Sequence, residues 1–285
     1  MTVQEPTRVR RVLHRKRAVV RDSLSVVNAT WRTLRHDRFL WRVLIGVTVA
    51  TLVGLTVWKL VGKAARPGER TKMRPLVIGA RLVAVLCVQY IVASWLYARW
   101  TGERDQRARH LWRRLARRLP AFFCCAAILG WLDYATRTST ASALIRTAAS
   151  FAFGYALSYA VPAAAVYRSG MLHAFRRSYE AFRKTFGADL FAWSGVWLVT
   201  GFVALITAIP EAFDFYSPGT APRGESGFVA RLVGWGLVVP ISLGALALSA
   251  GFCTVIFFAL ARNQAPAEYP KAAVETVSGL QLDDN

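Results

Sequence analysis

Long apolar runs alternate with basic segments along the chain. A helix needs about 20 apolar residues to cross a hydrocarbon core of roughly 30 Å. Several runs reach or approach that length, so the pattern predicts an all-α membrane protein with six transmembrane helices. The last run contains Pro240 but no polar turn, and we expect a single tilted or kinked helix there. The predicted spans are 43–61, 76–98, 119–134, 148–167, 191–209 and 232–260.

Three basic segments have the period of an amphipathic helix, and each precedes a pair of predicted spans. In the segment that begins at Met171, the aromatic positions share one face and the charged positions lie on the other. Such helices either lie in a membrane interface or pack on a protein core. The apolar stripes are Met171, Phe175, Tyr179, Phe182 and Phe186; Leu13, Val20, Leu24, Val27, Trp31 and Leu34; and Ala108, Trp112, Leu115 and Leu119.

The three segments align by their aromatic residues, as "WRTLRHDRFLW" from Trp31, "WRRLARRLPAF" from Trp112 and "YEAFRKTFGAD" from Tyr179. The alignment predicts three repeats of an amphipathic helix followed by a transmembrane hairpin. The repeats begin near residues 20, 103 and 171. Common ancestry and chance both stay open, because basic amphipathic patterns carry little information.

The charge distribution predicts the domain organisation and the orientation. Residues 1–42 form a basic segment with an amphipathic helix, residues 43–262 form the transmembrane domain, and residues 263–285 are expected to form a flexible tail. If both termini are cytoplasmic, most of the 37 Lys and Arg residues face the cytoplasm, as the positive-inside rule requires. The exception is the first outer loop, 62–75, which is itself basic. The first apolar run follows too long a basic segment for a cleaved signal, so we expect it to remain as a signal anchor.

Composition agrees with a multi-pass protein of the cell membrane. The hydrophobic fraction is 54% with a formal charge of +21 and a mean hydropathy of +0.32, so apolar and basic residues are segregated into blocks. A pI near 11.0 often indicates nucleic-acid binding, but the length of the apolar runs argues against that class here. The four cysteines all fall in apolar runs without ligand spacing, which predicts neither a disulfide framework nor a metal site.

The sequence offers little for catalysis. No carboxylate lies near the middle of a predicted span, which removes the usual group for proton- or sodium-coupled transport. The chain lacks GxxxxGK[ST], GxSxG and HExxH motifs, so we expect no enzyme and no cofactor. Gln89, an amide in the middle of a span, is predicted to hydrogen-bond across the bundle; lining a pore is the alternative.

Two sets of residues are the candidate sites. The first set is expected to contact anionic headgroups or a protein partner at the cytoplasmic face. The second set is expected to let helices approach closely and to kink the fourth span. The sets are Arg176, Arg177, Arg183, Lys184, Arg113 and Arg114, and Ala152, Ala156, Ala160 and Pro162.

Several short motifs carry a resemblance to a known group. They are a basic helix with Trp before the first span, "RRLP" entering the third, "SYAVPAAAVY" in the fourth and "AFRRSYEAFRKTFG" before the fifth. Over residues 20–262 the chain resembles uncharacterised prokaryotic six-span membrane proteins, similar to the membrane domain attached to some glycerophosphodiester phosphodiesterases. The resemblance implies a helical membrane domain, and it carries no catalytic residue over to this chain.

These observations favour a non-catalytic membrane assembly or accessory protein whose cytoplasmic basic helices lie on anionic lipid. The alternative is a transporter or pore for a small or lipid-like solute. A protein partner and a second copy of the chain both stay open as partners, and nucleic acid is not expected.

A peptide of residues 171–190 tests the headgroup hypothesis. Replacing Arg176, Arg177, Arg183 and Lys184 by Gln should weaken its binding to anionic vesicles, because each basic residue near such a surface contributes about 1 kcal/mol. Vesicle sedimentation measures the partition coefficient. Unchanged binding would contradict lipid contact by these residues.

Overall fold

The computed structural model describes residues 5–64, 67–103, 108–138, 159–186 and 225–283. This part of the chain is all-helical, as the sequence predicts. The fifth predicted span, 191–209, lies outside the described residues, and of the fourth only 159–167 are described. The helices are α1 Glu5–Arg35, α2 Arg38–Ala64, α3 Pro67–Trp100, α4 Ala108–Thr138, α6 Met171–Phe186, α8 Glu225–Arg262 and α9 Lys271–Ser278.

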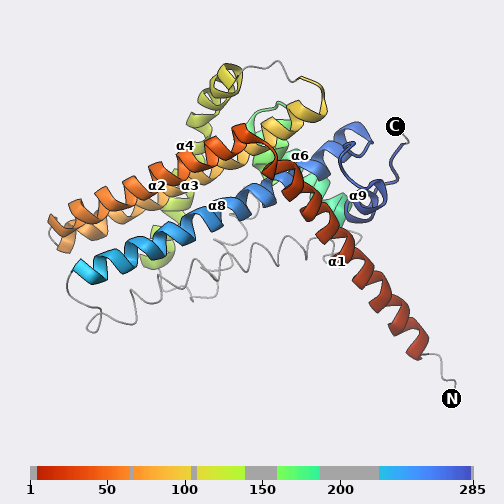
Figure 1. Cartoon of the computed structure of the whole chain (residues 1–285), viewed down its shortest axis with the longest axis horizontal. Coiled ribbons are helices and arrows are strands. Elements are labelled where there is room, and N and C mark those ends of the chain that lie inside the picture. The colour runs from red at the N-terminus through yellow and green to blue at the C-terminus, as the bar shows by residue number, and fades with distance from the viewer. Residues whose placement is uncertain (1–4, 65–66, 104–107, 139–158, 187–224, 284–285) are drawn as a thin grey trace.

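Helix α3 is the centre of the bundle and packs against α2, α4 and α8 (Figure 1). Most residues between Leu86 and Leu96 in its second half are buried, as are those between Ala250 and Ala259 in α8. Two stretches of the described residues, Leu82–Trp100 in α3 and Pro240–Arg262 in α8, are long and apolar enough to cross a bilayer. The largest fully buried side chains include Leu86, Ile91 and Leu96 of α3 and Phe252, Ile256 and Phe257 of α8.

The sixth predicted span is one continuous helix, as expected. Helix α8 runs through Pro240 without interruption. The end of the first predicted span and the start of the second differ from the prediction. Helix α3 begins at Pro67, three residues after α2 ends at Ala64, so most of the predicted outer loop 62–75 is helical. Proline suits this place, because the first helical position needs no backbone N–H.

The amphipathic segment 103–119 does not form a separate interfacial helix. From Ala108 onward the segment is continuous with the third predicted span in α4, which contains Pro120 in its interior. The sequence from Arg117 to Phe123 holds no glycine or other helix-ending signal, and a proline alone can be accommodated by a kink. The three amphipathic segments therefore differ in structure, and common ancestry of the three repeats stays a prediction.

Helix α1 leaves the bundle at the end where α2 begins and points away from it (Figure 1). Its C-terminal half is buried along one side by α8 and α9. The close approach to α8 depends on Gly251, where an added Cβ would overlap Thr30 Cγ2 and lie 3.3 Å from Leu96 Cδ1. A side chain at position 251 would separate α1, α3 and α8 from one another.

The C-terminal segment packs on α1, whereas the sequence predicted a flexible tail for 263–285. Tyr269, Val274, Val277 and Leu282 are each at most 5% exposed. The segment also closes on itself, since Asp283 N–H donates to the Asn263 carbonyl at 2.9 Å. The few apolar residues of α9 lie on one face of the helix, and this face is enough to dock it on α1. They are too few to predict a transmembrane span.

Replacing Gly251 by Ala should destabilise the protein by about 1–3 kcal/mol, because the new methyl group overlaps Thr30 and forces α1 outward. The thermal unfolding midpoint of the purified protein in detergent measures the change. Gly244→Ala is the matched control in the same helix, since a Cβ there meets nothing within 4 Å. Equal midpoints for the two variants would contradict this packing.

Candidate functional site: the polar junction at the basic end of the bundle

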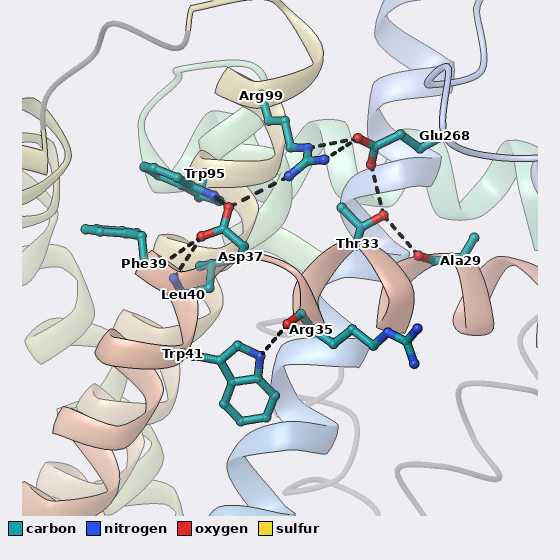
Figure 2. Close-up of polar contacts among 10 residues, drawn as sticks. All are labelled: Ala29, Thr33, Arg35, Asp37, Phe39, Leu40, Trp41, Trp95, Arg99 and Glu268. Carbon is teal, nitrogen blue, oxygen red and sulfur yellow. Dashed lines mark hydrogen bonds and ion pairs between the residues drawn. The ribbon is translucent and has the colours of Figure 1, made fainter.

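Asp37 is the centre of a polar junction at the basic end of the bundle (Figure 2). It lies in the short turn between α1 and α2. Asp37 Oδ1 accepts hydrogen bonds from the backbone N–H groups of Phe39 at 2.9 Å and Leu40 at 3.1 Å. These are unpaired donors of the first turn of α2, so Asp37 caps that helix.

The other oxygen of Asp37 connects the turn to α3. Trp95 Nε1–H donates to Asp37 Oδ2 at 2.5 Å, and Arg99 Nη1 lies 3.9 Å from the same oxygen. The Trp95 ring stacks on Phe39 with centroids 4.3 Å apart. The Asp37 side chain is only 11% exposed, so these donors replace the water it loses on burial.

Arg99 extends the junction to the C-terminal segment. Its Nε and Nη2 donate to Glu268 Oε1 at 2.9 and 2.6 Å. Glu268 Oε2 accepts from Thr33 Oγ1 at 2.9 Å, which returns the network to α1. One guanidinium therefore binds two carboxylates from segments that are far apart in the chain, as Figure 2 shows.

Tyr269 forms the buried side of the same contact. Its hydroxyl donates to Thr30 Oγ1 at 3.3 Å, and its ring packs edge-on against Trp100 with centroids 5.5 Å apart. Burial raises the pKa of Tyr269 to about 12, so the hydroxyl stays protonated and remains a donor at neutral pH.

A second polar cluster lies on the opposite side of α3 and is centred on Arg168. This residue ion-pairs with Glu103 and lies over the Tyr97 ring, 5.8 Å from its centroid. The hydrogen bond to Glu103 raises the pKa of Arg168 further. Arg168 has φ of 51°, and its carbonyl accepts from Arg118 Nη2 at 3.4 Å. The cluster connects the segment before α6 to the end of α3 and to the first half of α4.

The predicted headgroup residues belong to this same end but not to the junction. Arg113, Arg176 and Arg177 are exposed, and Arg114 is half-buried. Arg176 and Arg177 each lie 3.4 Å from Glu180 on the same helix, so their charge is partly neutralised. The side chains of Arg183 and Lys184 lie outside the described residues.

The face of α6 is divided between the bundle and the surroundings. Met171 is 8% exposed and Phe175 packs on the core, whereas Tyr179 is 66% exposed. In its first turns, α6 therefore packs its apolar face on the end of the bundle, which is the second of the two possibilities that its sequence predicts.

The predicted packing residues are described in part. Ala160 and Pro162 are buried in the helical stretch 159–166, beside Ala163 and Ala164. Ala152 and Ala156 lie outside the described residues. Gln89 is 2% exposed, but its Oε1 has no hydrogen-bond partner among the described residues, so the predicted bond across the bundle is not made by this atom there.

Sequence reasoning missed the junction itself. Asp37 had a local signal, because an aspartate directly before an apolar helix is a typical N-cap. Nothing local marks Glu268, which lies 235 residues from its partner Thr33.

The polar groups of the junction bind one another and so hold the helices together. Its carboxylates are satisfied by donors, and in the described part of the chain no three His, Cys, Asp or Glu side chains gather as metal ligands do. Comparison with protein-family models, with curated proteins and with solved structures finds no match to this chain. The resemblance noted over residues 20–262 stays a prediction.

Arg99→Gln should loosen the C-terminal segment, because the variant loses the charge that joins Glu268 to Asp37. Exposed pairs contribute about 0.2–1 kcal/mol, and this pair is only a third exposed, so we expect two- to fivefold faster proteolytic removal of the segment. Limited proteolysis followed by mass spectrometry measures the rate. Arg262→Gln is the control, since the one hydrogen bond that Arg262 makes to the described part of the chain is a 3.4 Å bond to Tyr97. Equal rates would show that the junction does not hold the segment.

Proposed function

We propose that the protein is a multi-pass helical protein of the cytoplasmic membrane that serves a non-catalytic assembly or accessory role. In this proposal the basic end of the bundle, which holds the polar junction, faces the cytoplasm and lies against anionic lipid. The six predicted spans and cytoplasmic termini are parts of the same proposal.

The observation that carries the proposal is a row of exposed aliphatic side chains on α2. Ile45, Val49, Val53 and Val57 recur every fourth residue and are 57%, 54%, 56% and 52% exposed. The row covers about 18 Å at 1.5 Å per residue. A bundle in water presents polar side chains on its outer faces, so a row of this kind indicates contact with hydrocarbon or with another protein.

Helix α4 has a comparable outer face. Phe123, Ile128 and Trp131 are 57%, 48% and 66% exposed. The bundle is therefore apolar on two of its outer faces as well as inside, which is the arrangement that lipid favours.

The direction of the helices agrees with the proposed topology. Helix α2 begins at the junction and runs away from it, whereas α3 and α8 end there: Arg99 of α3 binds Glu268, and Arg262 of α8 donates to Tyr97 of α3. Exposed arginines gather at this end, as the positive-inside rule expects for a cytoplasmic face. They include Arg32, Arg35, Arg38, Arg42, Arg113, Arg117, Arg168, Arg176, Arg177 and Arg262.

Close packing favours an accessory role over transport. Ala160, Ala163 and Ala164 are fully buried, and Gly251 brings α1 onto α8 with no room for a methyl group. One atom favours the alternative of a transporter or pore for a small or lipid-like solute. Gln89 Oε1 is buried in the second half of α3 and has no hydrogen-bond partner among the described residues, so it offers an acceptor to a polar solute.

Val49→Lys distinguishes a membrane protein from a soluble bundle. In water the change is close to neutral, because Val49 is exposed. In a bilayer a lysine near the middle of a span costs about 3 kcal/mol, so fewer chains should insert the first span correctly, and the yield of folded protein extracted from membranes with mild detergent should fall strongly. Val49→Leu is the control and should insert like the wild type. Equal recovery of the lysine variant would overturn the membrane proposal.

A further inference from the structure

Helix α1 has an apolar strip that does not coincide with its buried side. Of the stripe that the sequence predicts, Leu34 is buried and Val27 packs on the core, yet Leu24 and Trp31 are 46% and 39% exposed. The residues that α8 and α9 cover are instead Val19, Ser23, Val26, Thr30 and Thr33. At 100° per residue the buried set is centred about 130° around the helix from Leu24 and Trp31. One side of α1 thus packs on α8 and α9, and the apolar strip with Leu24 and Trp31 is exposed for another contact.

Basic side chains flank the strip. Arg17, Arg21, Arg32 and Arg35 are exposed and lie within about 100° of Leu24 around the helix. Asp22 is the nearest acidic residue on α1, and it ion-pairs with Arg21 at 3.5 Å. The strip therefore carries a surplus of positive charge along one edge, which complements an anionic surface rather than a neutral one.

The strip is continuous with the exposed row on α2. Trp31 and Trp41 meet edge-on with ring centroids 6.1 Å apart, and Trp41 lies one turn before Ile45. Trp41 Nε1–H donates to the Arg35 carbonyl at 3.1 Å, which keeps its ring at the corner between the helices. Tryptophans concentrate where hydrocarbon meets headgroups, because their rings are apolar and their N–H groups are polar.

The corner is held in place from the other side. Asp37 caps α2, Glu268 binds Thr33 of α1, and Gly251 lets α1 rest on α8. These contacts fix the direction in which α1 leaves the bundle (Figure 1). A leaflet that surrounds the α2 row would reach the α1 strip without any rearrangement of the bundle.

We propose that the strip formed by Leu24, Trp31 and Trp41, with its arginine edge, is a docking surface for the anionic inner leaflet of the membrane. The proposal rests on the proposed function, because it takes the α2 row to face hydrocarbon. It assigns the principal lipid contact to α1, whereas α6 uses Met171 and Ala174 for packing.

Site-specific photocrosslinking in the full-length protein tests this surface. The protein is reconstituted into phosphatidylcholine vesicles with and without phosphatidylglycerol, with a photoreactive amino acid at position 24, 45 or 276. Position 45 reports the α2 row, and Thr276 lies exposed on α9 as an aqueous control. We expect lipid adducts at 24 and 45 and none at 276. The adduct at 24, but not the one at 45, should increase with phosphatidylglycerol.

The arginine edge is tested by Arg21→Gln, Arg32→Gln and Arg35→Gln together. This change should lower the phosphatidylglycerol adduct at position 24 on the order of tenfold or more, since each basic residue near the surface contributes about fivefold. Arg117→Gln, Arg262→Gln and Lys271→Gln remove the same charge from residues outside the candidate headgroup set and should leave that adduct unchanged. A retained adduct at position 45 shows that each variant has inserted.

The outcomes separate the two proposals. A lipid adduct at 45 without one at 24 overturns the docking surface and leaves the membrane bundle intact. Loss of both adducts overturns the proposed function as well. A protein adduct at position 24, to a second copy or to another chain, also overturns the lipid assignment. If the two triple variants lose the position 24 adduct equally, the arginines beside Leu24 have no special role in binding anionic lipid.

Discussion

The contact of Arg99 with Asp37 and Glu268 is the interaction on which the arrangement of the basic end depends. It joins the turn before α2, the end of α3 and the C-terminal segment through one planar cation. Each carboxylate also takes a neutral donor, Trp95 for Asp37 and Thr33 for Glu268. Partly buried charges are tolerated only with such partners, so the members of the junction depend on one another.

The position of α1 follows from this junction. Asp37 fixes where α2 starts, and the bonds of Glu268 and Tyr269 to α1 determine which side of that helix is covered. Packing alone does not account for that side, because it includes Ser23, Thr30 and Thr33 beside Val19 and Val26, while Leu24 and Trp31 remain exposed. Hydrogen bonds between side chains have thus outweighed the burial of Leu24 and Trp31. The surface left over is apolar and basic, which suits a charged interface better than water.

The local pattern of apolar residues predicted correctly which of the described segments form long helices. The apolar runs became α2, α3, α4 and α8, and the run through Pro240 became one helix, because every backbone group in such a run is satisfied within the helix. Boundaries were predicted less well. Pro120 was expected to enter a span but lies inside α4, and Pro67 begins a helix within a predicted loop. In both places a proline is compatible with a helix start and with a kink, and local sequence does not distinguish the two.

By itself, the sequence determined the helical class, the segregation of charge from hydrocarbon-like surface and the amphipathic character of α1 and α6. Only the tertiary structure decided that the segment after Arg262 folds back on α1 and that Glu268 reaches Arg99 and Thr33. It also decided that Leu24 and Trp31 of the predicted stripe stay exposed while Leu34 is buried. The physical reason is the range of the interactions. Helical periodicity repeats within a few residues and is visible in any window, whereas the partner that covers one face of α1 comes from more than 200 residues further along the chain.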